Sequence, residues 1–315
     1  MHIRKSIFDS HSEKKILSQI ASRWESKLKL FPQLPLSKIV AIDPSEVSKK
    51  EFDYYRKSNV DFTFCNLQGQ PEISIEFDGI GGGFSRNGKY IPLRKTADPY
   101  RKLKFDFKLR ITSQLNYPLI IISFDELERF ILDDPLIVVD SIIGQYLANN
   151  RFNQIVEERK EHFKSITVSA HPAEVQGLLD WEFVSAEVEA KLEHNIIYSE
   201  GERYHYLLWE KLGKKLSFSE MDLFDNSIPP APPNGFPQNE KELQQLQNRI
   251  TAINNAQKMG YRVIVRTPQG DITTDIWIRA VDCPHVNPIS TIWDITRYVA
   301  FKRAYTILEL NYPKN

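Results

Sequence analysis

Acidic residues alternate with apolar ones in two neighbouring segments of the chain. Asp61 lies in the first segment, and Glu76 and Asp78 lie in the second. Alternation with a period of two is typical of β-strands, whose successive side chains point to opposite faces. If the strands form a hairpin that turns at Gln68 and Gly69, Asp61 lies directly opposite Glu76, with Cβ atoms roughly 5 Å apart. Two carboxylates at that spacing can bind one divalent cation.

The opposed carboxylates of Asp61 and Glu76 have two possible explanations. Like charges opposed on a sheet repel, so either a cation neutralises them or the hairpin is an edge pair whose polar face lies in water. A third acid, Glu13, falls on the apolar side of a helix predicted to begin at Ser12. Glu13 either points into the same interior as the hairpin acids or complements the positive end of the helix dipole.

Basic residues gather after the hairpin. Between residues 86 and 110, nine basic residues stand against two acidic ones, in a chain whose 41 basic and 41 acidic residues balance. A local excess of this kind predicts contact with a polyanion, and a solvated helix with a loop is the alternative. The candidate nucleic-acid ligands are Arg86, Lys89, Arg94, Lys95, Arg101 and Lys102, and the other three basic residues are Lys104, Lys108 and Arg110.

The elements that would position these residues follow in a definite order. A first helix, extended segments and the acidic hairpin precede a long loop, a helix that begins at about residue 98, and a continuous apolar strand at 117–123. The helix after the loop carries Lys104 and Lys108 one turn apart, on the flank of an apolar stripe. The stripe that we expect to be buried comprises Tyr100, Leu103, Phe107, Ile111 and Leu115.

This order of elements, with Asp61 in one strand and Ile75-Glu76-Phe77-Asp78-Gly79 closing the next, resembles the PD-(D/E)XK superfamily of restriction-endonuclease-like nucleases. Within it, the chain looks most similar to the branch related to very-short-patch-repair endonucleases. The resemblance covers about residues 10–130. It implies a mixed α/β core and a protein that cuts DNA with Mg²⁺ or Mn²⁺.

The resemblance also implies roles for single residues. Asp61 and Glu76 match the two catalytic acids, both as metal ligands, and Glu13 matches an acid that many members keep on the first helix. Such acids hold ions that polarise the phosphodiester and activate the attacking water.

The sequence departs from the family pattern at two positions. Val60 stands where the name-giving proline would be, and Asp78, a supporting candidate for the site, stands where the strand lysine would be. In some relatives the missing lysine comes from a neighbouring helix, a role that Lys104 or Lys108 can fill here. A lysine beside the phosphate would neutralise developing charge or orient the water.

We therefore expect an α/β protein with a mixed central sheet flanked by helices in a restriction-endonuclease-like domain at 1–165, and an accessory α+β region at 166–315. No apolar run reaches the roughly 20 residues of a membrane span, so no membrane partner is expected. The N-terminus lacks an apolar signal core, and the two cysteines, Cys65 and Cys283, form no paired motif. Both features predict a cytoplasmic protein.

Competing functions remain. A non-catalytic descendant of the same fold would bind nucleic acid, with DNA favoured, or a protein partner. An unrelated hydrolase or a structural protein would leave the acidic face merely solvated. The oligomeric state stays open, a homodimer included.

Overall fold

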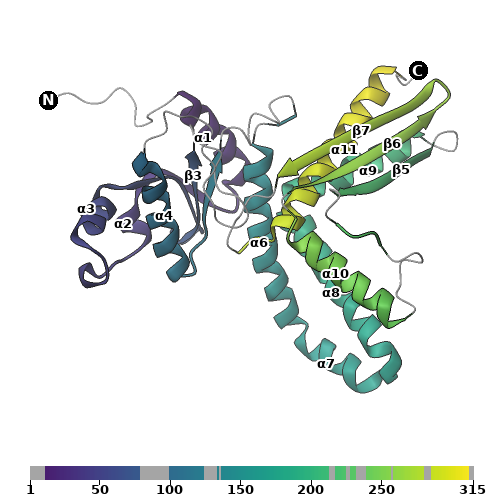
Figure 1. Cartoon of the computed structure of the whole chain (residues 1–315), viewed down its shortest axis with the longest axis horizontal. Helices are drawn as coiled ribbons and strands as arrows, with labels where there is room; N and C mark the ends of the chain where they lie inside the picture. Colours follow the sequence, from purple (N-terminus) through teal and green to yellow (C-terminus); the bar gives the residue numbers. More distant parts are fainter. Residues whose placement is uncertain are drawn as a thin grey trace. The chain divides into compact units, whose positions relative to one another are not determined.

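The computed structural model divides the chain into two compact units, residues 1–136 with 281–285 and residues 137–280 with 286–315. Each unit is described by itself (Figure 1). The expected boundary at residue 165 falls inside helix α7 of the second unit. The structure describes residues 11–78, 99–123, 133–134, 136–212, 217–224, 228–231, 239–256, 258–279 and 285–311.

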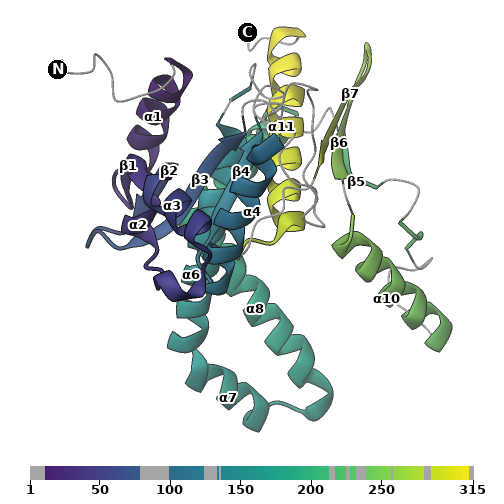
Figure 2. The same cartoon turned by 60° about the vertical axis from the view of Figure 1, so that its left-hand side comes forward.

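The first unit contains a four-stranded sheet in the order β1-β2-β3-β4. The pairs β1–β2 and β2–β3 are antiparallel and β3–β4 is parallel, so the sheet is mixed, as expected. Because parallel neighbours need a crossover, helix α4 (Pro99–Gln114) lies between β3 and β4 in the chain and beside them in space (Figures 1 and 2). The strands are β1 (Lys29–Pro35), β2 (Asn59–Cys65), β3 (Pro71–Asp78) and β4 (Leu119–Ser123).

From Phe62 to Phe64 the β2–β3 hairpin has the register that the sequence predicts, and the register shifts between Phe64 and Cys65. Phe62 pairs with Ile75, and Thr63 pairs with Ser74. Between the strands the chain turns at Gly69, whose φ of 88° lies in the left-handed region that favours glycine. The alternation of the sequence therefore divides the hairpin into an apolar face and a polar face.

The described part of the first unit contains four further helical segments. Helix α3 begins at a capping box, in which Ser48 Oγ accepts from the Glu51 N–H (3.3 Å) and the Glu51 carboxylate accepts from the Ser48 N–H (2.9 Å). Buried side chains of α2, α3, α4 and the sheet form one apolar cluster that fixes α3 beside α4. The segments are α1 (His11–Trp24), α2 (Leu36–Ile39), the 3-10 helix η1 (Pro44–Glu46) and α3 (Lys49–Lys57).

The second unit combines helices with a three-stranded antiparallel sheet in the order β5-β6-β7. Helix α11 packs against β6, β7 and α9, and α6 packs against α8. The helices are α6 (Ile137–Glu158), α7 (Lys160–Ser169), α8 (Pro172–His194), α9 (Ile196–Leu212), α10 (Glu240–Asn254) and α11 (Pro288–Asn311). The strands are β5 (Ser217–Phe224), β6 (Lys258–Thr267) and β7 (Gly270–Arg279).

None of the helices that the structure describes combines the length and the apolarity needed to span a lipid bilayer.

Candidate functional site

The polar face of the β2–β3 hairpin is buried. Thr63, Ser74 and Asp78 are 0% exposed and Glu76 is 6% exposed. The hydroxyl oxygens of Thr63 and Ser74 lie 3.0 Å apart across the two strands, which confirms that these side chains share a face. Because β2 and β3 are the inner strands of the sheet, the reading of a solvated edge hairpin is wrong. Buried acids on such a face need partners.

Glu76 finds its partner on α4. The Nζ of Lys108 donates to Glu76 Oε1, and it also donates to the backbone oxygen of Asn59 (2.7 Å). Both side chains are almost fully buried, with 6% of Lys108 and 7% of Glu76 exposed. Burial raises the pKa of Glu76 to about 7; Lys108 opposes that shift and the nearby charge of Asp61 adds to it.

Asp61 is half-buried at the start of β2 and is held by two donors. Its Oδ2 accepts from the Phe77 N–H at 2.8 Å, and its Oδ1 accepts from Gln33 Nε2 at 3.1 Å. Gln33 lies in β1 with a φ of 51°, an uncommon conformation for a residue other than glycine. Residues in such conformations cluster at functional sites. Gln33 is not among the residues that the sequence predicts for the site, because nothing in its sequence neighbourhood signals this conformation.

Asp78 is paired with Arg101. The Nε of Arg101 donates to Asp78 Oδ1 at 2.7 Å, and the guanidinium lies over the ring of Phe105, 5.1 Å from its centroid. The carboxylate of Asp78 is fully buried. Arg101 thus neutralises an acid of the sheet, and its contact with nucleic acid stays a prediction.

Two of the basic residues of α4 match two of the acids of β3. Arg101 and Lys108 are separated by two helical turns and face the sheet, where Asp78 and Glu76 lie two residues apart on one face. The ammonium group beside Glu76 therefore comes from Lys108 of α4 and not from a residue of the strand.

The structure corrects the apolar stripe that the sequence predicted on α4. Phe107 and Ile111 are buried, but Tyr100, Leu103 and Leu115 are each more than half exposed. The helix is rotated so that its cations reach the acids of the sheet, since burying these carboxylates without partners would cost more than exposing apolar side chains.

The other predicted site residues lie elsewhere. Lys104 is exposed and lines a pocket between α3 and α4, and Lys102 is exposed and paired with Asp106 at 2.5 Å. Glu13 lies in α1, but its side chain falls outside the described part of the structure. Arg86, Lys89, Arg94 and Lys95 also lie outside the described residues.

The donor set of Asp61 and Glu76 fits a hard divalent ion. Within the described part of the chain, no three His, Cys, Asp or Glu side chains group closely enough to hold a metal ion by themselves. Mg²⁺ at phosphate-handling sites is bound by one or two carboxylates, completed by water and by phosphates of the substrate. Asp61 and Glu76 are carboxylates of the type that such a site uses.

Comparisons of this chain with protein-family models, with curated proteins and with solved structures find no match.

Proposed function

We propose that this chain is a metal-dependent nuclease of the PD-(D/E)XK type that hydrolyses phosphodiester bonds in DNA. The observation that carries the proposal is the contact between Lys108 and Glu76, whose carboxyl group also lies close enough to Asp61 for that charge to raise its pKa. The family pattern requires two acids and a lysine, and this chain has Asp78 at the position of the strand lysine. A lysine from α4 meets that requirement.

Each side chain has a definite part in the proposed reaction. Asp61 and Glu76 would hold Mg²⁺ or Mn²⁺, which when bound polarises the phosphodiester and lowers the pKa of an attacking water. Water adds to phosphorus and the P–O ester bond breaks, so one product keeps the phosphate and the other takes up a proton as a hydroxyl. The ammonium group of Lys108 would stabilise the charge that develops on the phosphate or orient the water.

Three further hydrogen bonds hold this arrangement in place. The Phe77 N–H and Gln33 fix the two oxygens of Asp61. The Asn59 carbonyl fixes Lys108. Groups that position ligands in this way are the usual support of a metal site, and their loss costs roughly 10- to 100-fold in affinity or activity.

A second candidate function is a non-catalytic module that binds nucleic acid. The ion pair between Lys108 and Glu76 favours this second function, because it neutralises both charges without a metal. This alternative predicts binding of DNA that does not depend on Mg²⁺ or on Asp61.

The test is cleavage of supercoiled plasmid and single-stranded DNA with Mg²⁺ or Mn²⁺. We expect that Glu76→Ala abolishes cleavage, with a loss of at least about 100-fold. Glu72→Ala is the matched control, because Glu72 is an acid of the same strand, four residues before Glu76, and accepts a hydrogen bond from the Asn66 amide at 3.1 Å. Equal cleavage by both variants, or none by the wild type, would refute the proposal.

A further inference from the structure

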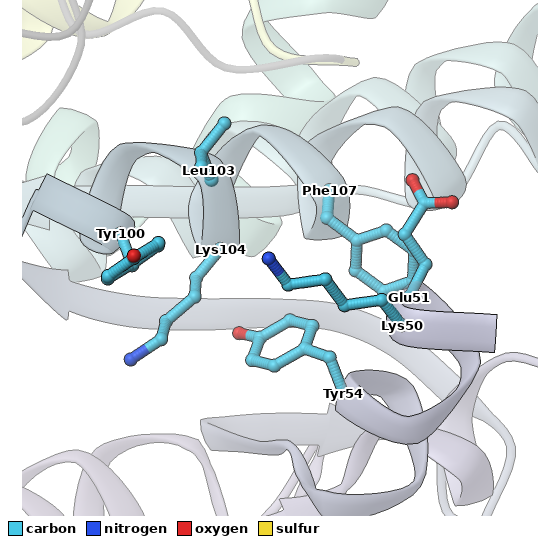
Figure 3. A pocket seen from close by; sticks show the side chains of 7 residues that line it. All are labelled: Lys50, Glu51, Tyr54, Tyr100, Leu103, Lys104 and Phe107. Atoms are coloured by element: carbon cyan, nitrogen blue, oxygen red, sulfur yellow. The ribbon is translucent and has the colours of Figure 1, made fainter. Parts of the chain in front are cut away.

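A pocket of about 440 Å³ lies between α3 and α4 in the first unit (Figure 3). Its volume falls in the roughly 300–1,000 Å³ range of small-molecule sites. The seven residues that line it are Lys50, Glu51 and Tyr54 from α3 and Tyr100, Leu103, Lys104 and Phe107 from α4. The acids of the sheet do not line it, so this pocket is distinct from the site described above.

Two tyrosines provide aromatic surface in the pocket. Tyr54 packs edge to face on Phe107, with ring centroids 5.5 Å apart, and this contact fixes its orientation. Tyr100 is 58% exposed, which leaves much of its ring accessible. Aromatic rings that are both anchored and accessible are the surfaces on which unpaired nucleobases stack.

Two lysines make the pocket cationic. Lys50 and Lys104 extend toward the space between the tyrosines, and Lys50 Nζ lies 5.7 Å from the centroid of the Tyr100 ring (Figure 3). The one acid of the lining, Glu51, is engaged by Arg110 and by Ser48, and the hydrogen bonds from Ser48 lower its pKa below the ordinary value. The charge of the pocket therefore complements an anion.

We propose that this pocket binds an unpaired base of single-stranded DNA together with its phosphate. The base would stack on Tyr54 or Tyr100, and Lys50 and Lys104 would contact the phosphate. Bases of a duplex are already stacked and paired, so they cannot enter such a pocket without being extruded. The choice of DNA rests on the proposed function, whereas the preference for unpaired bases comes from the lining of the pocket.

The position of the pocket links it to the proposed catalytic lysine. Lys104 and Lys108 lie one turn apart on α4, with Lys104 at the pocket and Lys108 at Glu76. A strand whose base is held at the pocket would therefore lie along the helix that carries Lys108. This placement predicts that single strands, or unpaired segments of a duplex, are the preferred substrates.

The test measures binding of fluorescein-labelled oligonucleotides by anisotropy, using the full chain in EDTA so that metal-dependent cleavage does not occur. The probes are a single strand of about ten nucleotides, the same strand as a duplex, and an abasic strand of equal length that keeps the phosphates. We expect the single strand to bind at least about fivefold more tightly than the other two, as the stacking of one base predicts.

The variants separate stacking from charge. Tyr100→Ala removes an exposed ring, and Tyr54→Leu keeps apolar contact with Phe107 while removing the aromatic face. Each should weaken binding of the single strand at least about fivefold and leave the abasic strand unaffected. Tyr206 is a tyrosine of the second unit that is 60% exposed. As the control, Tyr206→Ala should change the affinity for neither the single strand nor the abasic strand.

A second pair of variants tests the lysines. Lys50→Gln should weaken binding of all three probes more than Lys49→Gln does. Lys49 is exposed on the same helix but does not line the pocket, so long-range attraction is matched in the two variants. Loss of one phosphate contact should also lower the salt dependence of binding.

The outcomes distinguish this inference from the proposed function. Unchanged single-strand affinity in both tyrosine variants, or equal affinity for the abasic strand, would overturn the pocket assignment even if the wild type cuts DNA. Conversely, single-strand binding that depends on the tyrosines, in a protein that cuts no DNA with Mg²⁺ or Mn²⁺, would support the pocket and refute the nuclease.

Discussion

Each unit of this chain buries a carboxylate near a lysine. In the first unit Glu76 is 6% exposed and pairs with Lys108; in the second Asp294 is 2% exposed, with an oxygen 3.7 Å from Lys191 Nζ. Burial raises the pKa of both acids, to about 7 for Glu76 and to about 6 for Asp294. By burial and pKa alone, the two positions are nearly equivalent.

Their surroundings differ. Near Glu76 lies a second fixed acid, Asp61, on a strand of the same sheet. Asp294 lies between helices and accepts from the Asn195 amide at 2.9 Å, and the other acid near it, Glu187, is half exposed and paired with Lys191 at 3.2 Å. A buried acid with a raised pKa is therefore a weak sign of function, and a second fixed carboxylate beside it is the stronger one.

The largest expected effect separates the two lysines. Lys108→Met should lower DNA cleavage by at least about 100-fold, because its ammonium group would stabilise charge on the phosphate. Lys191→Met should leave cleavage per folded molecule unchanged. Plasmid cleavage by the two variants, corrected for the folded fraction by circular dichroism, gives the comparison. A similar loss in both would mean that the effect comes from folding.

Stability should respond alike in both units. Lys108→Met and Lys191→Met should each lower the free energy of unfolding by about 3 kcal/mol, since each leaves a buried carboxylate without its cation. Adding Glu76→Gln to the first variant and Asp294→Asn to the second should recover most of the loss. Urea denaturation of the wild type, the four single variants and the two double variants gives the comparison. Double variants that lose the sum of their single losses would show that these pairs are not coupled.

The pH dependence of Asp294 has a definite sign. Its pKa is higher in the folded protein, about 6, than the roughly 3.9 of an unfolded aspartate, so the folded state binds the proton more tightly. Stability from this group is therefore greatest at low pH and is lost as the pH rises through about 4 to 6. In the wild type this group lowers the free energy of unfolding by about 2 to 3 kcal/mol between pH 4 and neutral pH. Asp294→Asn should remove that decrease.

Urea denaturation of the wild type and of Asp294→Asn across this pH range tests the prediction. Parallel curves for the two proteins would show that Asp294 has the same pKa in the folded and unfolded states.

A smaller effect is expected at Gln33. Gln33→Gly removes the hydrogen bond to Asp61 but suits the positive φ of this position, so we expect cleavage to fall about tenfold with stability changed by less than about 1 kcal/mol. Plasmid cleavage and thermal unfolding of the same sample check both parts. Full activity in this variant would show that Gln33 does not position Asp61.

The hairpin was predictable because its signals are local. A period of two and a glycine turn determine which residues pair, and the pairing of Phe62 with Ile75 confirms that register. The orientation of α4 was not predictable in this way. Apolar spacing predicted that Tyr100 and Leu103 are buried, but partners for two acids from a different part of the sequence determine which face meets the sheet.

Sequence alone could not decide whether Lys104 or Lys108 reaches the acids, because this also depends on the orientation of α4. Both lie on one flank of the helix in sequence, and only the rotation of α4 brings Lys108 to Glu76 and Lys104 to the pocket. Gln33 had no sequence signal, because its role depends on an uncommon backbone conformation beside Asp61.

The most direct test of the metal site is a titration with Mn²⁺ alone, followed by electron paramagnetic resonance of the free ion, on the wild type, Glu76→Ala and Glu72→Ala. We expect equal Mn²⁺ affinity for the wild type and Glu72→Ala, and an affinity at least about tenfold weaker for Glu76→Ala. The same affinity in all three proteins would contradict the assignment of Asp61 and Glu76 as metal ligands.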